Sequence, residues 1–173
     1  NTPTVIMSNH CSLFDIPISY AVFEHRLRMI AKKELFRIPC FGSAMRNARH
    51  ISMDRSNPRM AIKNLKQAQQ AIQDGILLWV APEGTRSPDG ELQTFKSGGF
   101  KLALAAGANI IPMTIRGSHH ILSKNSWMIN RHQTIDVTIG QAISTESYEG
   151  HEGLKALMQK VKASIEAPLM DAT

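Results

Sequence analysis

A histidine and an aspartate stand five positions apart, His10 and Asp15, in a polar stretch that follows a short apolar run. The run at 4–7 predicts a buried strand, and residues 16–23, with Pro17 in the first turn, predict a helix. His10 would then lie on the strand-to-helix loop, with Asp15 near the helix start. A carboxylate can orient an imidazole through one ring nitrogen and leave the other free to take a proton from a hydroxyl. The pair is therefore a candidate for general base catalysis.

Other interpretations of this stretch stay open at this point. A loop histidine beside an aspartate that caps the helix would give the same pattern. Cys11 makes a cysteine nucleophile an alternative, although a small buried side chain is the commoner role of such a residue. A metal pair would need further ligands, and the sequence has no His-Glu-x-x-His and no Cys/His cluster nearby. We therefore expect no metal site.

A second polar stretch runs from Glu83 to Ser87, directly after the strongest apolar run of the chain, 76–80. The carboxyl end of a sheet strand is where α/β proteins bind ligands. Gly84 lets the backbone approach a ligand closely, and Arg86 offers a planar fork suited to phosphate. The stretch predicts an anion-binding loop, the alternative being a polar loop with a surface arginine.

Strand patterns alternate with helix patterns along the chain. Strands are expected at 4–7, 28–31, 50–53, 76–80, 110–115 and 134–139, and helices at 16–23, 58–74, 98–106 and 153–167. This alternation predicts an α/β fold with a central mixed or mostly parallel sheet flanked by helices. Residues 1–173 form one domain on this interpretation. Because the chain starts at Asn1 close to a strand, we expect an upstream membrane-associated segment that this sequence lacks.

The net charge is +6 and the isoelectric point about 9.6, which favours an anionic partner. Aromatic residues make up only 6% and the basic residues are dispersed, so we expect no nucleic acid partner. Two cysteines are too few for a disulfide framework, and the apolar runs are too short to cross a membrane. Apolar residues at 36–41 stand among lysines and arginines, a pattern that indicates docking on an anionic membrane surface.

Four stretches in a fixed order resemble the motifs of the glycerolipid acyltransferase family. They are Asn9-His10-x-Ser12-x-x-Asp15, Gly42 through Met53-Asp54-Arg55, Pro82-Glu83-Gly84-Thr85-Arg86-Ser87 and Ile110-Ile111-Pro112-Met113. The resemblance runs from about Thr4 to Ile143 and is closer to the bacterial 1-acylglycerol-3-phosphate acyltransferases of the PlsC type. Met53 departs from the Ile, Val or Phe common before Asp-Arg, but its apolar character is kept. The resemblance implies the fold of that family.

By the same resemblance, His10 is the general base and Asp15 its orienting partner. The substrate-binding residues that it implies are Arg55, Glu83, Gly84, Thr85, Arg86 and, as a weaker candidate, Lys32. No cofactor is implied, because the acyl group arrives as a thioester of coenzyme A or acyl carrier protein, which is a co-substrate. The oxyanion would be met by backbone amides near His10 or by the Lys32 ammonium.

The implied reaction is transfer of a fatty acyl group to the hydroxyl of 1-acylglycerol 3-phosphate, giving phosphatidic acid. The implied partners are a lysophospholipid, the acyl donor and an anionic membrane surface, and the implied location is the cytoplasmic face of the membrane. Alternatives are the same chemistry on glycerol 3-phosphate or a lyso-ornithine lipid, and a basic lipid-binding domain without catalysis. A serine hydrolase is disfavoured because the sequence has no Gly-x-Ser-x-Gly elbow.

Overall fold

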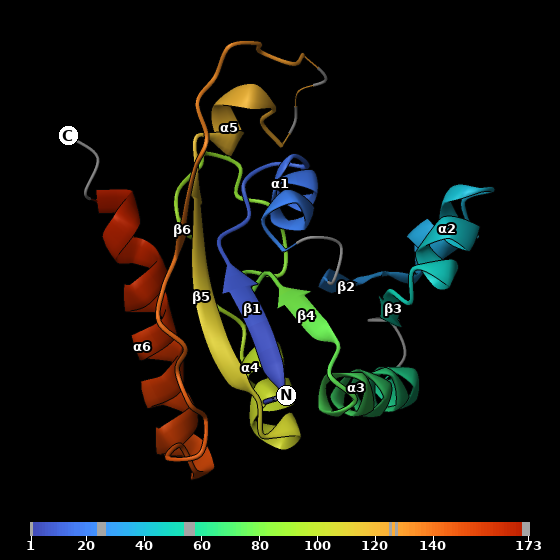
Figure 1. Ribbon diagram of the computed structural model, residues 1–173, viewed down its shortest axis with the longest axis vertical. Coiled ribbons are helices and arrows are strands. Elements are labelled where there is room, and N and C mark those ends of the chain that lie inside the picture. Colours follow the sequence, from blue (N-terminus) through green and yellow to red (C-terminus); the bar gives the residue numbers. More distant parts are fainter. Residues whose placement is uncertain (1, 24–26, 54–57, 125, 127, 171–173) are drawn as a thin grey trace.

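The computed structural model describes residues 2–23, 27–53, 58–124, 126 and 128–170. Six strands form a sheet in the order β3-β2-β4-β1-β5-β6 (Figure 1). Their bounds are β1 Thr4–Ser8, β2 Leu27–Lys32, β3 Ile51–Met53, β4 Leu77–Val80, β5 Asn109–Arg116 and β6 Asp136–Ile139. The neighbouring strands pair in parallel except β5 and β6, which are antiparallel. The predicted α/β fold with a mostly parallel sheet is confirmed.

Helices cover the two faces of the sheet unequally. Their bounds are α1 Asp15–Val22, α2 Phe41–Asn47, α3 Pro58–Gln73, α4 Gly98–Ala106, α5 Ser118–Ile121 and α6 Gly150–Met170, with a 3-10 helix η1 at Lys33–Arg37. One face packs Val5, Met7 and Ile110 of the strands against α3, α4 and α6. Side chains alternate along a strand, so their neighbours point to the other face.

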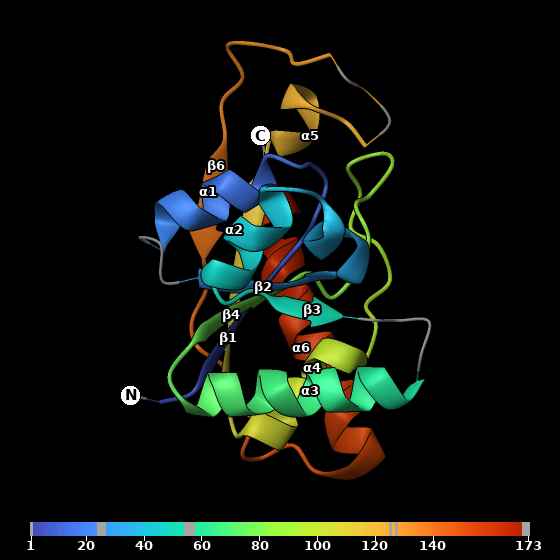
Figure 2. The same cartoon turned by 90° about the vertical axis from the view of Figure 1, so that its right-hand side faces the viewer.

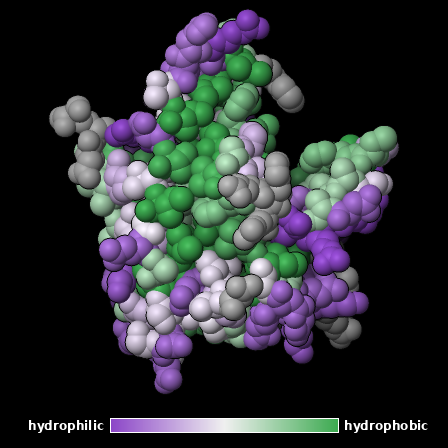
Figure 3. All heavy atoms as spheres, viewed as in Figure 1, coloured by the Kyte–Doolittle hydropathy of each residue, from purple (hydrophilic) through white to green (hydrophobic). Residues whose placement is uncertain are grey.

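On that other face, Ile6, Trp79 and Met113 pack against α1. Because α1 is only eight residues long, it covers part of the face. A green apolar band remains at the surface where Figure 1 shows β5 and β1 (Figure 3). Ile139 at the β6 edge is 50% exposed.

Chain direction brings the two polar stretches of the sequence together. β1 and β4 are parallel neighbours, with Met7 opposite Val80, so the loops that follow them leave the same edge of the sheet. Helix α1 begins at this edge, and α5 lies at the same end of the molecule (Figure 2). Parallel strand ends of this kind are where α/β proteins bind their ligands.

The segment after β2 is helical, although the sequence patterns indicated no helix there. It contains η1 and α2, and it projects from the body beside β3 (Figure 1). Phe36, one of the apolar residues of the docking pattern, is buried, with 9% of its surface exposed, so it is part of the packing. Gly42 packs so closely on the Phe36 carbonyl that a side chain would not fit there.

The chain also contains one helix, α5, that the sequence patterns did not indicate, and α6 is longer than the predicted 153–167. Within the described ranges, no helix combines the length and the apolar character that crossing a membrane requires.

Candidate active site

His10 is held in place through its backbone, directly after β1. Its N–H donates to Oε1 of Glu83 at 2.7 Å, and its carbonyl accepts the N–H of Ser87 at 2.7 Å. The preceding residue, Asn9, accepts the Ile115 N–H at 2.8 Å and donates to the Ile115 carbonyl at 2.7 Å. The loop is thus fixed to β5 on one side and to the loop after β4 on the other.

The ring of His10 is oriented by Asp15, the first residue of α1. Nδ1 of His10 lies 2.8 Å from Oδ2 of Asp15, whose side chain is buried. The same oxygen accepts the N–H groups of Cys11 at 2.7 Å and Ser12 at 2.9 Å. A carboxylate accepts hydrogen bonds, so Nδ1 carries the proton and Nε2 is left with a free lone pair. The imidazole packs edge-on against Trp79, with ring centroids 5.5 Å apart.

The neighbouring Cys11 and Ser12 are not placed to attack a substrate. Burial, together with the charges of Asp15 and Glu83, raises the pKa of the Cys11 thiol to about 12. The thiolate needed for nucleophilic attack is therefore scarce at neutral pH. The Ser12 hydroxyl donates to the Leu122 carbonyl at 2.7 Å. Of the groups in this loop, the imidazole alone is free to act as a base.

Glu83 lies behind the second loop and its carboxylate binds backbone. Its Oε1 accepts from His10 and its Oε2 accepts the Gln93 N–H at 2.9 Å. Burial raises the pKa of this carboxyl, whereas the two backbone hydrogen bonds lower it. Through these two contacts Glu83 shapes the loop, and its assignment as a substrate-binding residue stays a prediction.

Gly84, Thr85 and Arg86 face a cavity. Gly84 has a φ of +73°, a conformation that glycine adopts without strain, and a Cβ there would lie 3.2 Å from the Lys96 side chain. Thr85 is exposed and Arg86 half-buried at the rim. The glycine therefore lets the loop turn closely beside a lysine.

The cavity, of about 1390 Å³, is bordered by His10 as well. It carries both cationic and apolar side chains. The cations are Arg28, Lys32, Arg86, Lys96 and Lys124, and the apolar lining includes Leu13, Ile16, Met29, Leu35, Phe41, Met45 and Trp79. A concave site with apolar walls and a few convergent polar groups is typical of a small-molecule site. Here the wall chemistry suits an anionic head with an apolar tail.

Most of the candidate residues meet at this cavity. His10, Lys32, Gly84, Thr85 and Arg86 line it, and Asp15 lies behind His10. Arg55 falls outside the described residues. Among those that are described, no group of three or more metal-ligating side chains comes together.

Sequence reasoning gave no role to Lys124, Tyr20 or His50, which also line the cavity. None of the three stands in a motif, and their grouping depends on tertiary packing. Lys96 also lines the cavity, and its place two residues before the start of α4 is a sequence signal for anion binding.

The fold and the cavity define an α/β protein with a histidine–aspartate pair at a cavity that has both cationic and apolar walls. The family model named Acyltransferase matches residues 1–116, and the chain belongs to this acyltransferase family. The 1-acyl-sn-glycerol-3-phosphate acyltransferase of Pseudomonas aeruginosa is 35% identical over 162 residues, covering 93% of this chain and 62% of that protein. A coconut (Cocos nucifera) protein of the same name is 37% identical over 150 residues, covering 86% of this chain and 48% of its own length.

Solved structures agree with this assignment. The crystal structure of PlsC, the 1-acyl-sn-glycerophosphate acyltransferase of Thermotoga maritima, matches with a TM-score of 0.80 at 27% identity. The match covers 100% of this chain and 69% of that one. The chain thus spans about half to two thirds of the length of these curated relatives.

Proposed function

We propose that the protein transfers a fatty acyl group from an acyl thioester to the free hydroxyl of 1-acylglycerol 3-phosphate. The observation that carries the proposal is the His10–Asp15 hydrogen bond of 2.8 Å at a cavity that also holds Arg86 and Lys32. The names of the relatives support the acceptor. The apolar lining matches an acyl chain, and the cations match a phosphate.

In the proposed reaction, Nε2 of His10 takes the proton of the acceptor hydroxyl as its oxygen bonds to the thioester carbonyl carbon. The tetrahedral intermediate then collapses with cleavage of the carbon–sulfur bond. The leaving thiolate takes the proton from the imidazolium, which restores the neutral base. Asp15 stabilises the imidazolium between these two steps. The donor is a thioester of coenzyme A or of acyl carrier protein.

The developing oxyanion needs a donor, and the amides of His10, Cys11 and Ser12 are already in use. The N–H of His10 binds Glu83, and those of Cys11 and Ser12 bind Asp15. We therefore assign the oxyanion to the Lys32 ammonium at the cavity wall. Arg86, with Thr85 beside it, is assigned to the acceptor phosphate, and Arg55 remains a candidate for the same role.

The proposed working surface is an anionic membrane, approached from its cytoplasmic face. Ile38 is 47% and Phe41 50% exposed on the projecting segment, which we define as residues 33–47, η1 through α2. Arg37 and Arg46 are exposed on the same segment. Figure 3 shows this projection as apolar on one side and hydrophilic on the other. Apolar tips with flanking cations are typical of interfacial docking.

The test is an acyl-transfer assay with a radiolabelled acyl thioester and a panel of acceptors. We expect label in phosphatidic acid when lysophosphatidic acid is supplied, and less product with glycerol 3-phosphate or a lyso-ornithine lipid. If glycerol 3-phosphate or the lyso-ornithine lipid were labelled preferentially, the proposed acceptor would be replaced and the proposed acyl transfer would stand. Release of free fatty acid without transfer would indicate a hydrolase. No turnover at all, with lipid still bound, would favour the lipid-binding domain.

A further inference from the structure

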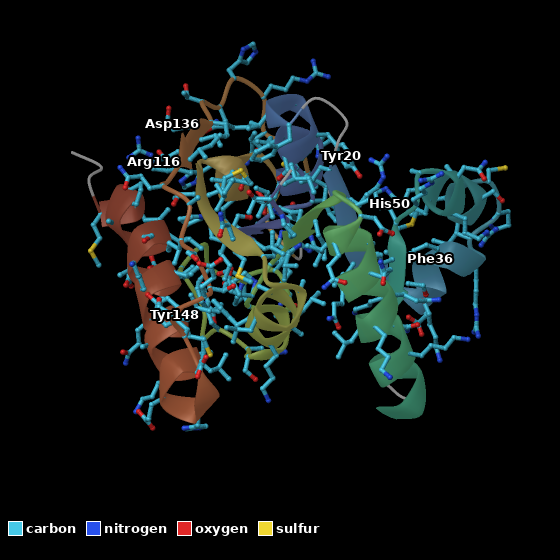
Figure 4. The ribbon with its side chains drawn as sticks, turned by 60° about the horizontal axis from the view of Figure 1, so that its bottom comes forward. Tyr20, Phe36, His50, Arg116, Asp136 and Tyr148 are labelled. Atoms are coloured by element: carbon cyan, nitrogen blue, oxygen red, sulfur yellow. The ribbon has the colours of Figure 1, made fainter. Side chains whose placement is uncertain are left out.

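A tyrosine and a histidine meet on the wall of the catalytic cavity, away from the two motif loops. Tyr20 comes from α1 and His50 directly precedes β3, and their side chains point toward one another (Figure 4). The Tyr20 hydroxyl lies 3.0 Å from Nε2 of His50, and the ring centroids are 6.1 Å apart at 81°. Both residues line the cavity that His10 lines.

The hydrogen bonds fix where the protons of this pair lie. The backbone N–H of Met29 donates to Nδ1 of His50 at 3.2 Å, so Nδ1 is the acceptor and is unprotonated. Burial and the charge of Arg28 lower the pKa of His50, which keeps the ring neutral. Nε2 therefore carries the ring proton and donates it to the Tyr20 oxygen. Burial also raises the pKa of Tyr20, so the phenol keeps its own proton.

This leaves the Tyr20 O–H as a donor without an acceptor among the described residues. The cavity wall includes apolar side chains such as Ile16, Met29 and Met45, and the cationic Arg28 acts on both Tyr20 and His50. A hydroxyl in such surroundings gains from a hydrogen-bonding oxygen and gains nothing from a methylene group. The Tyr20 hydroxyl can thus distinguish a lipid that offers an oxygen acceptor from a plain hydrocarbon chain.

We propose that Tyr20, oriented by His50, donates a hydrogen bond to an ester or hydroxyl oxygen of the lipid held in the cavity. This inference rests on the proposed function. The shared chemistry is an oxygen acceptor on an otherwise apolar chain. Two sources fit it: the ester carbonyl of the monoacyl acceptor, and a 3-hydroxyl on the acyl donor. Tyr20 would act as a specificity residue, separate from the base and from the phosphate cations.

The experiment compares Tyr20→Phe with the matched control Tyr148→Phe. Tyr148 packs against the core on the opposite sheet face, beside α6, and does not line the cavity. Kinetics are measured with 1-acyl- and 1-alkylglycerol 3-phosphate of equal chain length, and with plain and 3-hydroxyacyl thioesters. Calorimetric titration with the same four compounds reports binding without turnover.

We expect Tyr20→Phe to weaken one oxygen-bearing compound by about two- to tenfold in kcat/KM and affinity, the range of a neutral hydrogen bond. The kcat/KM and affinity for the matching compound without that oxygen should be unchanged by Tyr20→Phe. Tyr148→Phe should leave the values for both compounds unchanged. Loss confined to the ester acceptor assigns the acceptor as the source, and loss confined to the 3-hydroxyacyl thioester assigns the donor. Equal losses with all four compounds, or none, would overturn the inference. If wild-type protein binds selectively but transfers nothing, the proposed function fails and the subsite remains.

Discussion

The carboxylate of Glu83 binds the backbone of His10, 73 positions away, through a hydrogen bond of 2.7 Å from the His10 N–H. Its second oxygen holds the Gln93 N–H at 2.9 Å. The return contact, from the Ser87 N–H to the His10 carbonyl at 2.7 Å, closes the connection. The two motif loops therefore form one rigid unit, in which Glu83 positions the base from behind.

Replacing Glu83 with glutamine tests this arrangement. Glutamine keeps the shape but has one acceptor oxygen, so its NH₂ group must face one of the two backbone N–H donors. We expect the free energy of unfolding to fall by about 1–3 kcal/mol, the cost of leaving a buried polar group without a hydrogen bond. Turnover should fall with little change in KM, because the imidazole is displaced. Chemical denaturation and steady-state kinetics measure the two effects. Glu91→Gln, an exposed change in the same loop, is the control; if it behaves alike, the positioning role is wrong.

His10→Ala should lower kcat by roughly 10²–10⁴-fold, the usual contribution of a positioned base. Asp15→Asn should lower kcat as well, because the imidazole loses the partner that stabilises its charged form. The double variant should be little worse than His10→Ala, since groups that act as a unit are not additive. Circular dichroism checks that each variant folds. Near-normal turnover of His10→Ala would show that His10 is not the general base.

Arg86→Ala should reduce kcat/KM for lysophosphatidic acid by about ten- to a hundredfold, the value of a charged hydrogen bond of 1.5–3 kcal/mol. The loss should appear mainly in the acceptor's KM. Arg86→Lys should recover part, because lysine keeps the charge and loses the fork. Lys101→Ala, an exposed change on α4 outside the cavity, serves as the control. A neutral monoacylglycerol weakened to the same degree as lysophosphatidic acid would disprove the phosphate assignment.

Membrane docking is tested by replacing Phe41 with serine. Phe41 and Ile139 are both 50% exposed, but Phe41 lies on the projecting segment and Ile139 on the edge of the sheet. We expect Phe41→Ser to weaken sedimentation with anionic liposomes and Ile139→Ser to have little effect. Binding should fall with salt, because the flanking cations are screened. Equal binding to neutral and anionic vesicles at all salt concentrations would exclude an electrostatic contribution of the cations to membrane docking.

His50 predicts a pH dependence of stability. Its pKa in the folded protein is lowered by burial and by Arg28, so the unfolded chain binds the proton more tightly. The stabilisation is therefore present above the ordinary value of about 6.5 and declines as the pH falls below it. Urea midpoints at pH 7.5 and 5.5 should show a smaller difference in His50→Asn than in the wild type. His151→Asn, a change at an exposed site, should keep the wild-type difference.

The parts of the fold that follow from sequence are those set by local pattern. The apolar run at 76–80 predicts β4, and the spacing of His10 and Asp15 across a strand-to-helix loop predicts their contact. The projecting segment was missed because α2 is only seven residues long and starts after Cys40 at a φ of +62°, which residue preferences do not indicate.

The parts of the site that escaped prediction depend on distant contacts. The two backbone amides that Glu83 binds belong to different segments, so its acceptor role is visible only once β1 and β4 are side by side. The pairing of Tyr20 with His50 joins α1 to the start of β3, a contact between residues 30 positions apart.

The burial of Cys11 has a practical consequence for spectroscopy. The sequence contains two cysteines, and the pKa of the buried one is raised to about 12, whereas Cys40 is exposed between η1 and α2. A maleimide fluorophore should therefore attach to the unmodified protein at a single position. That position lies on the projecting segment, where the emission of an environment-sensitive dye would report its immersion depth directly.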